Sequence, residues 1–347
     1  MEQAFSGLRK AQKGPALCSA ESAAAPKIPW GSTPAADRPI SVSSVLLLFL
    51  YNSTFNMGKE SSLNKSVGIV SKPNKPEVAQ VLPELTEWLR GRGYGFIVDP
   101  ETAPHASGAE VVSRIEMATR KLDFVIVLGG DGTLLSAARA VAKAGIPILG
   151  VNLGALGFLT EVPLEELYPT LDSLDKGSCG IDVRAMVHCE VGREGSIIAS
   201  YDALNDVVVG KGTIARLNHC DVYIDKIFVS RYQADSLIVS TPTGSTAYSL
   251  AAGGPILMPN VEAFVVTPVS AHSLTHRPLV VRDSSQIEIV VMTGQEEAYL
   301  SIDGQAGMPM LDGDRVHCRK SQYRVKLLHT KGTFFDVLRT KLKWGQR

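Results

Sequence analysis

The sequence has no excess of charge of either sign. Lys and Arg together number 35, as do Asp and Glu, so the formal net charge at pH 7 is zero. A protein that binds nucleic acid without regard to sequence presents a basic surface, because such binding depends on neutralising phosphates. The balance therefore predicts no nucleic-acid partner, although a local basic patch is compatible with it.

Cysteine is scarce and never occurs in a CxxC spacing. The five cysteines are Cys18, Cys179, Cys189, Cys220 and Cys318. An odd, scattered set does not make the disulfide framework of a secreted domain, so we expect a reducing compartment and a cytoplasmic protein. A histidine directly precedes each of the last three, which raises the question of a zinc site. Neighbours on a strand point to opposite faces, so we interpret each pair as a core cysteine beside a surface histidine.

No apolar run marks a membrane span. The run at residues 45–51 is far shorter than the roughly 20 residues that a spanning helix needs, so no membrane partner is expected. It lies too far from the N-terminus for an ordinary signal peptide. Residues 1–56 are otherwise rich in Ala, Ser and Pro without a sustained period. We predict a disordered extension there, with a transit peptide or a wrong start, corrected at Met57, as alternatives.

Residues 57–163 alternate apolar strands with amphipathic helices. The expected strands are 67–70, 94–98, 123–128 and 147–151, and the expected helices are 76–90, 109–121 and 134–144. This alternation is typical of an α/β domain with a parallel, doubly wound (Rossmann-like) sheet.

Residues 164–310 are rich in short β-branched runs separated by glycine or polar turns. The expected strands include 186–191, 204–209, 220–229, 236–240, 264–267 and 287–292, with 324–328 beyond them. We predict an all-β, sandwich-like second domain. Residues 311–347 form a C-terminal segment that we expect to pack back on the α/β domain.

A glycine-rich segment with an acid at its centre, Gly129-Gly130-Asp131-Gly132-Thr133, follows the strand at 123–128. Ligands bind beyond the carboxyl ends of strands in open parallel sheets. The glycines let backbone N–H groups approach phosphate oxygens, and the next helix offers its positive end to the same anion. A carboxylate repels phosphates, so its presence indicates proton transfer, metal binding or orientation of a hydroxyl. The alternative is a tight turn closed by Asp-Gly.

The second unusual segment, residues 241–255, reads TPTGSTAYSLAAGGP. It concentrates hydroxyls and small residues around one aromatic ring between two β regions. Such a segment can donate hydrogen bonds to an amide or a base, with Tyr248 as a ring platform. The alternative is a short capped helix that ends at Gly-Gly-Pro.

With these two segments and the pair Asn205-Asp206 in the same order, the sequence resembles the NAD kinase family from about residue 66 to the C-terminus. Residues 235–241 and 272–279 also look like family landmarks. GGDGT is shared with lipid kinases and phosphofructokinase-like enzymes, whereas the segment TAYSLAAGGP is much more specific. The resemblance implies transfer of the γ-phosphoryl group of ATP to the 2′-hydroxyl of the adenosine ribose of NAD, which makes NADP. Inorganic polyphosphate stays open as a donor.

The resemblance also implies roles for individual residues. Asp131 would be the general base, and the phosphate loop would comprise Gly129, Gly130, Gly132 and Thr133. NAD would contact Asp131, Gly132, Asn205, Asp206, Arg216, Gln233, Asp235, Thr246, Ala247, Tyr248, Ser249, Leu250, Ala251 and Gln305.

The sequence departs from the family pattern at two places. Residues 268–272, PVSAH, replace the commoner PICPH, which puts a substrate role for His272 in doubt. Gln233 is neutral where some members carry a cation, which leaves the preference between NAD and NADH open.

A divalent cation, Mg²⁺, is expected to offset the triphosphate charge, although the sequence shows no dedicated set of metal ligands. It has no GxxxxGK[ST] loop, so it is not a P-loop enzyme. The resemblance further implies a homodimer or homotetramer.

Three other functions compete with this interpretation. A lipid kinase would share GGDGT but would have a membrane-binding surface and no TAYSLAAGGP segment. A non-catalytic dinucleotide sensor would gain nothing from an acid beside phosphates. An NAD-dependent dehydrogenase would need GxGxxG with an acid about twenty residues later, and the sequence lacks that spacing.

Overall fold

The computed structural model describes residues 65–154, 156–211, 218–294, 297–329 and 332–344. The predicted extension at residues 1–56 lies outside these ranges, as does Arg216. The chain divides into the units Met1–Leu50 and Tyr51–Arg347, and all described residues belong to the second. Within the described ranges, we find no helix with the length and apolar character of a membrane span.

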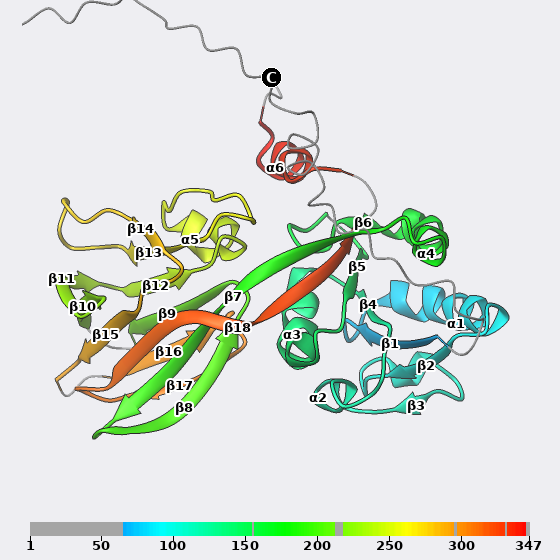
Figure 1. Ribbon diagram of the computed structural model, residues 1–347, viewed down its shortest axis with the longest axis horizontal. Coiled ribbons are helices and arrows are strands. Elements are labelled where there is room, and N and C mark those ends of the chain that lie inside the picture. The colour runs from blue at the N-terminus through cyan, green and yellow to red at the C-terminus, as the bar shows by residue number, and fades with distance from the viewer. Residues whose placement is uncertain (1–64, 155, 212–217, 295–296, 330–331, 345–347) are drawn as a thin grey trace, which may run out of the picture. The chain divides into compact units, whose positions relative to one another are not determined.

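The first part of the described chain forms an α/β lobe around a parallel sheet (Figure 1). Its strands are β1 (Ser66–Ser71), β2 (Gly95–Val98), β3 (Glu110–Val111), β4 (Phe124–Leu128), β5 (Ile148–Asn152) and β6 (Val162–Pro163). Its helices are α1 (Pro76–Gly91), α2 (Arg114–Met117), α3 (Asp131–Val141) and α4 (Leu167–Asp175), with 3-10 turns η1 (Ala103–His105), η2 (Ala142–Ala144) and η3 (Leu164–Glu166). The strands lie in the order β5-β4-β1-β2-β3. From β1 the chain adds β2 and β3 on one side and then β4 and β5 on the other, so the strand order reverses between β1 and β4. Ligand crevices form at such switch points.

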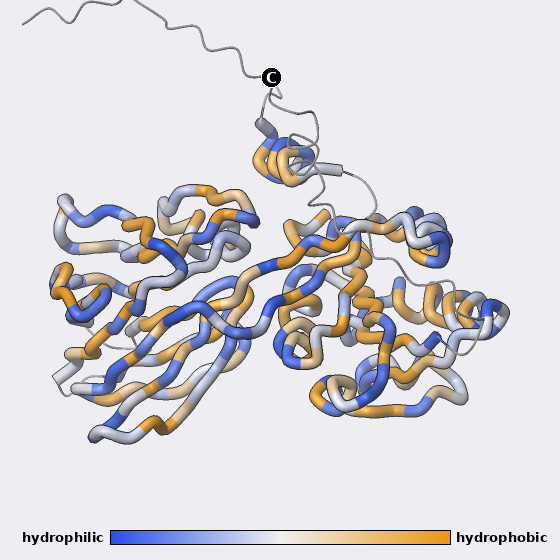
Figure 2. The backbone as a smooth tube through the Cα atoms, viewed as in Figure 1, coloured by the Kyte–Doolittle hydropathy of each residue, from blue (hydrophilic) through white to orange (hydrophobic). Residues whose placement is uncertain are grey.

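Alternating burial explains why β4 lies at the centre of this sheet. Phe124, Ile126 and Leu128 pack with α1 and α4 on one face, whereas Val125 and Val127 pack with α3 on the other. All five side chains are buried, and each contributes about 1.5–3 kcal/mol through burial of apolar surface. In Figure 2 the central strands of this sheet are mainly orange, as expected for strands covered on both faces.

The expected helix at residues 109–121 is wrong in extent. Glu110–Val111 forms the short strand β3, which pairs with β2, and only the single turn α2 follows. Ser113 caps α2 by accepting a hydrogen bond from the Glu116 N–H, and the Glu116 carboxylate accepts one from the Ser113 N–H. This capping box starts the helix at Arg114, five residues later than the apolar pattern suggested.

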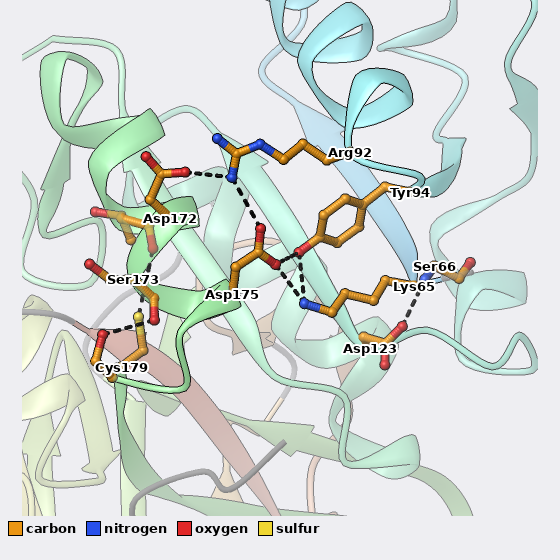
Figure 3. A network of polar contacts seen from close by, with 11 residues as sticks. Lys65, Ser66, Arg92, Tyr94, Asp123, Asp172, Ser173, Asp175 and Cys179 are labelled. Carbon is orange, nitrogen blue, oxygen red and sulfur yellow. Dashed lines mark hydrogen bonds and ion pairs between the residues drawn. The ribbon is translucent and has the colours of Figure 1, made fainter. Parts of the chain in front are cut away.

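A polar network at the amino edge of the parallel sheet ties α4 to β1 and α1 (Figure 3). The Asp175 carboxylate accepts hydrogen bonds from Lys65 Nζ at 2.5 Å, Arg92 Nη1 at 3.3 Å and the Tyr94 hydroxyl. Burial and the hydrogen bond to Asp175 raise the pKa of Tyr94 well above its ordinary value, so its hydroxyl remains a neutral donor. The GGDGT segment lies at the opposite edge, so this network serves the fold.

The second part of the chain forms a β lobe of two antiparallel sheets. The first sheet has the order β14 (Leu279–Arg282), β13 (Ala263–Val269), β12 (Ser236–Ser240), β9 (Asp206–Lys211), β16 (Ala298–Ile302) and β17 (Ala306–Met310). The second contains β11 (Ile227–Ala234), β10 (Asn218–Ile224), β15 (Ile287–Met292), β18 (Arg315–His329), β7 (Gly180–Arg193) and β8 (Ser196–Ala203). Both sheets contribute to one apolar core, which confirms the predicted sandwich.

The cysteines of the β lobe belong to this core. Cys189 on β7 lies directly opposite Cys318 on β18, and both are buried, as is Cys220. The preceding histidines point the other way: the side chain of His188 is 15% exposed and that of His317 is 44% exposed. The structure thus confirms a core cysteine beside a surface histidine at residues 317–318, whereas His188 is largely buried and hydrogen-bonded to Asp202 and Glu190.

Two long strands, β7 and β18, belong to both lobes (Figure 1). They pair with each other along their lengths, and Leu327 of β18 pairs with Ile148 of β5. One sheet therefore continues from the β lobe into the α/β lobe. After β18 the chain forms α6 (Phe334–Leu342), whose Lys341 Nζ lies 5.6 Å from the centre of the Phe158 ring. The α/β lobe also includes α4, which packs in its core although residue 164 was expected to begin the β domain.

Candidate functional site

The GGDGT segment connects the carboxyl end of β4 to the amino end of α3. Gly130 is the N-cap of α3 and Asp131 is the first helical residue. A Cβ at Gly129 would lie 2.7 Å from the Thr133 hydroxyl oxygen, so this close turn requires glycine. The first N–H groups of α3 have no partner within the helix, so its amino end attracts anions.

The Asp131 carboxylate is held by the loop that follows β5. Its Oδ1 accepts hydrogen bonds from the N–H groups of Leu159 at 3.0 Å and Thr160 at 3.1 Å, and from the Thr160 hydroxyl at 3.2 Å. Its Oδ2 accepts one from the Phe158 N–H at 2.9 Å. An oxygen of a carboxylate accepts about two hydrogen bonds. Oδ1 is therefore saturated by described residues, and Oδ2 has room for a further donor.

This loop approaches Asp131 so closely that it needs glycine. A Cβ at Gly157 would lie 2.0 Å from Asp131 Oδ1 and 2.4 Å from the Thr160 hydroxyl oxygen. Residues 157–160 were not among the predicted site residues. The signal that would have found them is topological, because the carboxyl ends of neighbouring parallel strands meet at one edge, and β5 is the neighbour of β4.

The predicted pair Asn205-Asp206 lies in a turn whose backbone is bound by Asp303. The Asp303 carboxylate accepts hydrogen bonds from the N–H groups of Leu204 at 3.2 Å, Asn205 at 2.8 Å and Asp206 at 3.2 Å. Asp303 and Gly304 form the tip of the β16–β17 hairpin with positive φ angles of 51° and 64°. Asp-Gly favours a turn with positive φ at two successive residues. The hairpin thereby presents Asp303 to the turn at 204–206.

Residues 241–244 pack directly against the same turn. The Thr241 N–H donates to the Asn205 carbonyl at 2.9 Å, and the Thr241 hydroxyl donates to the Leu204 carbonyl at 2.5 Å. A Cβ at Gly244 would lie 2.1 Å from the Asn205 carbonyl oxygen. Two motifs that lie far apart in the sequence are therefore adjacent in the structure.

Asp206 is an unusual carboxyl in this turn because it is buried. Only 5% of the residue is exposed, and burial, reinforced by the nearby charge of Asp303, raises the pKa of Asp206 to about 7. Near neutral pH the Asp206 carboxyl is therefore protonated in a large fraction of the molecules. A protonated carboxyl can donate a hydrogen bond as well as accept one.

Several hydroxyls of the 241–255 segment bond within the protein. The Ser249 hydroxyl pairs with that of Thr267 at 2.9 Å, and the Thr246 hydroxyl donates to the Thr243 carbonyl at 3.1 Å. The segment forms η4 (Gly244–Thr246) and α5 (Tyr248–Ala251). Tyr248 remains 43% exposed, and Ala251 is exposed as well, whereas Ala247 and Leu250 are half-buried. The ring of Tyr248 is thus available to a ligand.

Gln305 joins the glycine segment, but Gln233 and Asp235 lie elsewhere. Gln305 Nε2 donates to the Gly132 carbonyl at 2.6 Å. Gln233 is the next-to-last residue of β11, and Asp235 precedes β12 at the end remote from Thr241. The five residues of β12 separate Asp235 from Thr241, so six steps of extended chain place them roughly 20 Å apart. Gln233 and Asp235 therefore lie at the end of β11 and β12 that is remote from Thr241.

No metal cage marks this region in the described part of the chain. No group of three or more His, Cys, Asp or Glu residues within it is arranged to hold a metal ion. A cavity of about 800 Å³ lies between the β7–β8 hairpin, β15 and β18, and one of about 470 Å³ lies between α2 and α3. None of the predicted site residues lines either cavity, so the hydrogen-bonded turns around Asp131 and Asn205 define the candidate site.

Two family models match the two parts of the chain. Residues 67–178 match the ATP-NAD kinase N-terminal domain, and residues 204–330 match the ATP-NAD kinase C-terminal domain. Among curated proteins, the NAD kinase of Koribacter versatilis is 56% identical over 283 residues, which cover 82% of this chain and 99% of that protein. The NAD kinase of Acidobacterium capsulatum is 52% identical over 284 residues, which cover 82% of this chain and all of that protein.

Two solved structures are also similar. Yeast NADH kinase in complex with NADH superimposes with a TM-score of 0.73 and 27% identity, covering 82% of this chain and 89% of that chain. An NAD kinase from Archaeoglobus fulgidus in complex with ATP superimposes with a TM-score of 0.64 and 24% identity, covering 81% of this chain and all of that chain. The second likeness concerns the fold alone.

Proposed function

Because this chain belongs to the ATP-NAD kinase family, we propose that it transfers the γ-phosphoryl group of ATP to the 2′-hydroxyl of the adenosine ribose of NAD, with Asp131 as general base. The family resemblance predicted from the sequence is confirmed, and the chain is a phosphotransferase that acts on NAD. The identity of the donor, the role of Asp131 and the individual substrate contacts are our proposals.

The single observation that supports Asp131 most is the way its carboxylate is held. Three backbone N–H groups and one hydroxyl fix its orientation, and Oδ2 keeps room for one more donor. We assign that place to the ribose 2′-hydroxyl, whose proton Oδ2 accepts as the phosphoryl group arrives. A positioned base of this kind contributes about 10²–10⁴-fold to the rate.

The amino end of α3 is the proposed site for the transferred phosphate. The glycines at 129 and 130 leave the backbone open there, and the helix dipole favours negative charge at that end. The protein forms no covalent bond to the substrates in this kind of phosphoryl transfer. Alignment of the γ-phosphate with the hydroxyl therefore supplies most of the rate enhancement.

The turn at 204–206 and the neighbouring segment 246–251 are the proposed NAD site. Asn205 offers an amide and Asp206 a carboxyl that titrates near neutral pH, so both suit ribose hydroxyls or an adenine edge. The exposed Tyr248 ring suits stacking against a planar base. Contacts from Gln233, Asp235 and Arg216, and assembly into a homo-oligomer, are proposals that rest on the family alone.

Mg²⁺ is the proposed metal, and we expect the phosphates of ATP rather than protein side chains to bind it. The described residues offer no cluster of three or more metal-ligating side chains, so no resident metal site fits. Mg²⁺ keeps several waters and binds through substrate phosphates in most kinases. We therefore propose that it arrives with ATP, as part of the substrate.

The proposed reaction is tested with purified protein, NAD, ATP and Mg²⁺, with NADP as the product measured. Parallel reactions replace ATP with inorganic polyphosphate or NAD with NADH. They show which phosphoryl donor is used and whether the oxidised or the reduced nicotinamide ring is preferred. Diacylglycerol and sphingosine serve as alternative acceptors. NADP formation with no lipid phosphorylation is the expected result. Phosphorylation of a lipid without NADP would replace this proposal with a lipid kinase.

A further inference from the structure

Arg139 extends from α3 to the tip of the β16–β17 hairpin. Its Nη1 donates to Asp303 Oδ2 at 3.1 Å, and its Nη2 donates to Gln305 Oε1 at 2.6 Å. The Asp303 side chain is completely buried, whereas that of Arg139 is 21% exposed. One planar guanidinium therefore binds two side chains of the β lobe from a helix of the α/β lobe, and of these three residues only Gln305 belonged to the predicted site.

Each partner of Arg139 is also hydrogen-bonded to one half of the candidate site. Asp303 binds the three backbone N–H groups of the turn at 204–206, which carries Asn205 and Asp206. Gln305 binds the carbonyl of Gly132, the residue after Asp131. Two short chains of hydrogen bonds thus run from Arg139, one to the proposed NAD turn and one to the start of α3.

We propose that Arg139 is a positioning residue that fixes the separation between Asp131 and the Asn205–Asp206 turn. The inference rests on the proposed function, since it assigns the base and the NAD contact to these two places. Arg139 itself touches neither the substrate nor the reacting atoms. Its effect is exerted through distance, because a misplacement of about 1 Å between reacting groups costs on the order of 100-fold in rate.

The competing interpretation is an ion pair that only stabilises the contact between the lobes. Asp303 already accepts three backbone N–H groups, so its buried charge does not depend on Arg139 alone. Buried ion pairs are also weak contributors to net stability compared with apolar packing. What only arginine provides at this place is a rigid fork that holds two acceptors at a fixed spacing.

The substitution Arg139→Lys separates the two interpretations, because lysine keeps the charge but cannot hold both acceptors in one plane. We expect kcat/KM for NAD to fall by about 10- to 100-fold, while the melting temperature changes little. The matched control is Arg193→Lys. Arg193 binds the equally buried Asp314 through two hydrogen bonds of 2.9 and 2.7 Å within the β lobe, away from the site. This control is expected to affect the melting temperature at least as much and the kinetics hardly at all.

A second measurement, amide hydrogen exchange, does not depend on activity. In Arg139→Lys the amides of residues 204–206 are expected to exchange faster than in the wild type, and in Arg193→Lys they should not. Unchanged exchange, or unchanged kinetics despite faster exchange, would overturn the proposal. If Arg139→Lys does not fold, Asp303→Asn, which keeps the side-chain size, is measured in the same way. If the wild type makes no NADP, the proposed function fails, and the exchange comparison still decides whether Arg139 holds the turn.

Discussion

Asp131 and Asp303 are held in the same manner, since each accepts hydrogen bonds from three successive backbone N–H groups of a neighbouring turn. They differ in what else surrounds them. Asp303 is fully buried and bound by Arg139, whereas no described arginine or lysine forms an ion pair with Asp131. Of the two, only Asp131 retains an oxygen with room for another donor, which makes it the carboxylate that can react.

The substitution Asp131→Asn tests that role. The side chain keeps its size and most of its hydrogen bonds but can no longer accept the hydroxyl proton. We expect kcat to fall by about two to four orders of magnitude, the range that a positioned base contributes. The KM values for NAD and ATP should change little, since binding groups remain. Steady-state kinetics are the measurement, and retention of more than about a tenth of kcat would mean that the carboxylate is not the base.

Asp206 gives a prediction about pH and stability. Its pKa of about 7 in the folded protein exceeds the ordinary value of about 3.9. Between these two values the folded state keeps a proton that the unfolded state loses. The free energy of unfolding therefore falls as pH rises from about 4 to about 7, by roughly 1.4 kcal/mol for each pKa unit of difference.

Asp206→Asn removes this titration, so its stability relative to the wild type should rise with pH. Urea unfolding at pH 5 and pH 8 measures the difference. We expect the variant to gain about a few kcal/mol on the wild type between these pH values. A stability difference that is the same at both pH values would show that Asp206 does not titrate in this range.

At the scale of elements, the site combines two loops that follow the neighbouring strands β4 and β5. The first loop was predictable because GGDGT stands out by composition and follows an apolar run. The loop at 157–160 carries no such composition, and its part becomes visible only once β5 is placed beside β4. The Asp303-Gly304 turn is similar, because Asp-Gly predicts a hairpin but not what the hairpin touches. Contacts between residues about 100 positions apart depend on strand register, which short motifs do not encode.

Gly157→Ala tests the importance of the second loop. The added methyl group would occupy the place of Asp131 Oδ1, so the loop must withdraw and release the carboxylate. We expect kcat to fall by about 100-fold, the cost of misplacing a reacting group. Gly91→Ala is the control, since a Cβ there meets nothing within 4 Å at the end of α1. Equal activity of the two variants would mean that the loop does not orient Asp131.

At the scale of the whole molecule, the two lobes are not independent. Leu327 and Leu328 of β18 are buried, and Leu328 belongs to the same core as α1 and α4. The α/β half alone would therefore lack a strand beside β5 and part of its core. The predicted division into an α/β and an all-β domain agrees with the architecture, but sequence patterns could not show that one strand serves both.

A fragment of residues 65–179 is accordingly expected not to fold by itself. Circular dichroism during heating should show no cooperative transition for this fragment. Co-expression with residues 180–344 is the control, and it should restore a cooperative transition by supplying β18. A sharp melting transition of the fragment alone would contradict the shared-strand interpretation.

The shared strand also has a consequence for synthesis on the ribosome. Residue 315, where β18 begins, is translated 163 residues after residue 152, where β5 ends. At about 5–20 residues per second, this takes roughly 8–30 s. During that time the β5 edge of the nascent sheet lacks its β18 partner, and unpaired edges recruit foreign strands. A ribosome that stalls late in the message would thus release a chain whose α/β half, with its Asp131 loop, is incompletely folded and prone to aggregation.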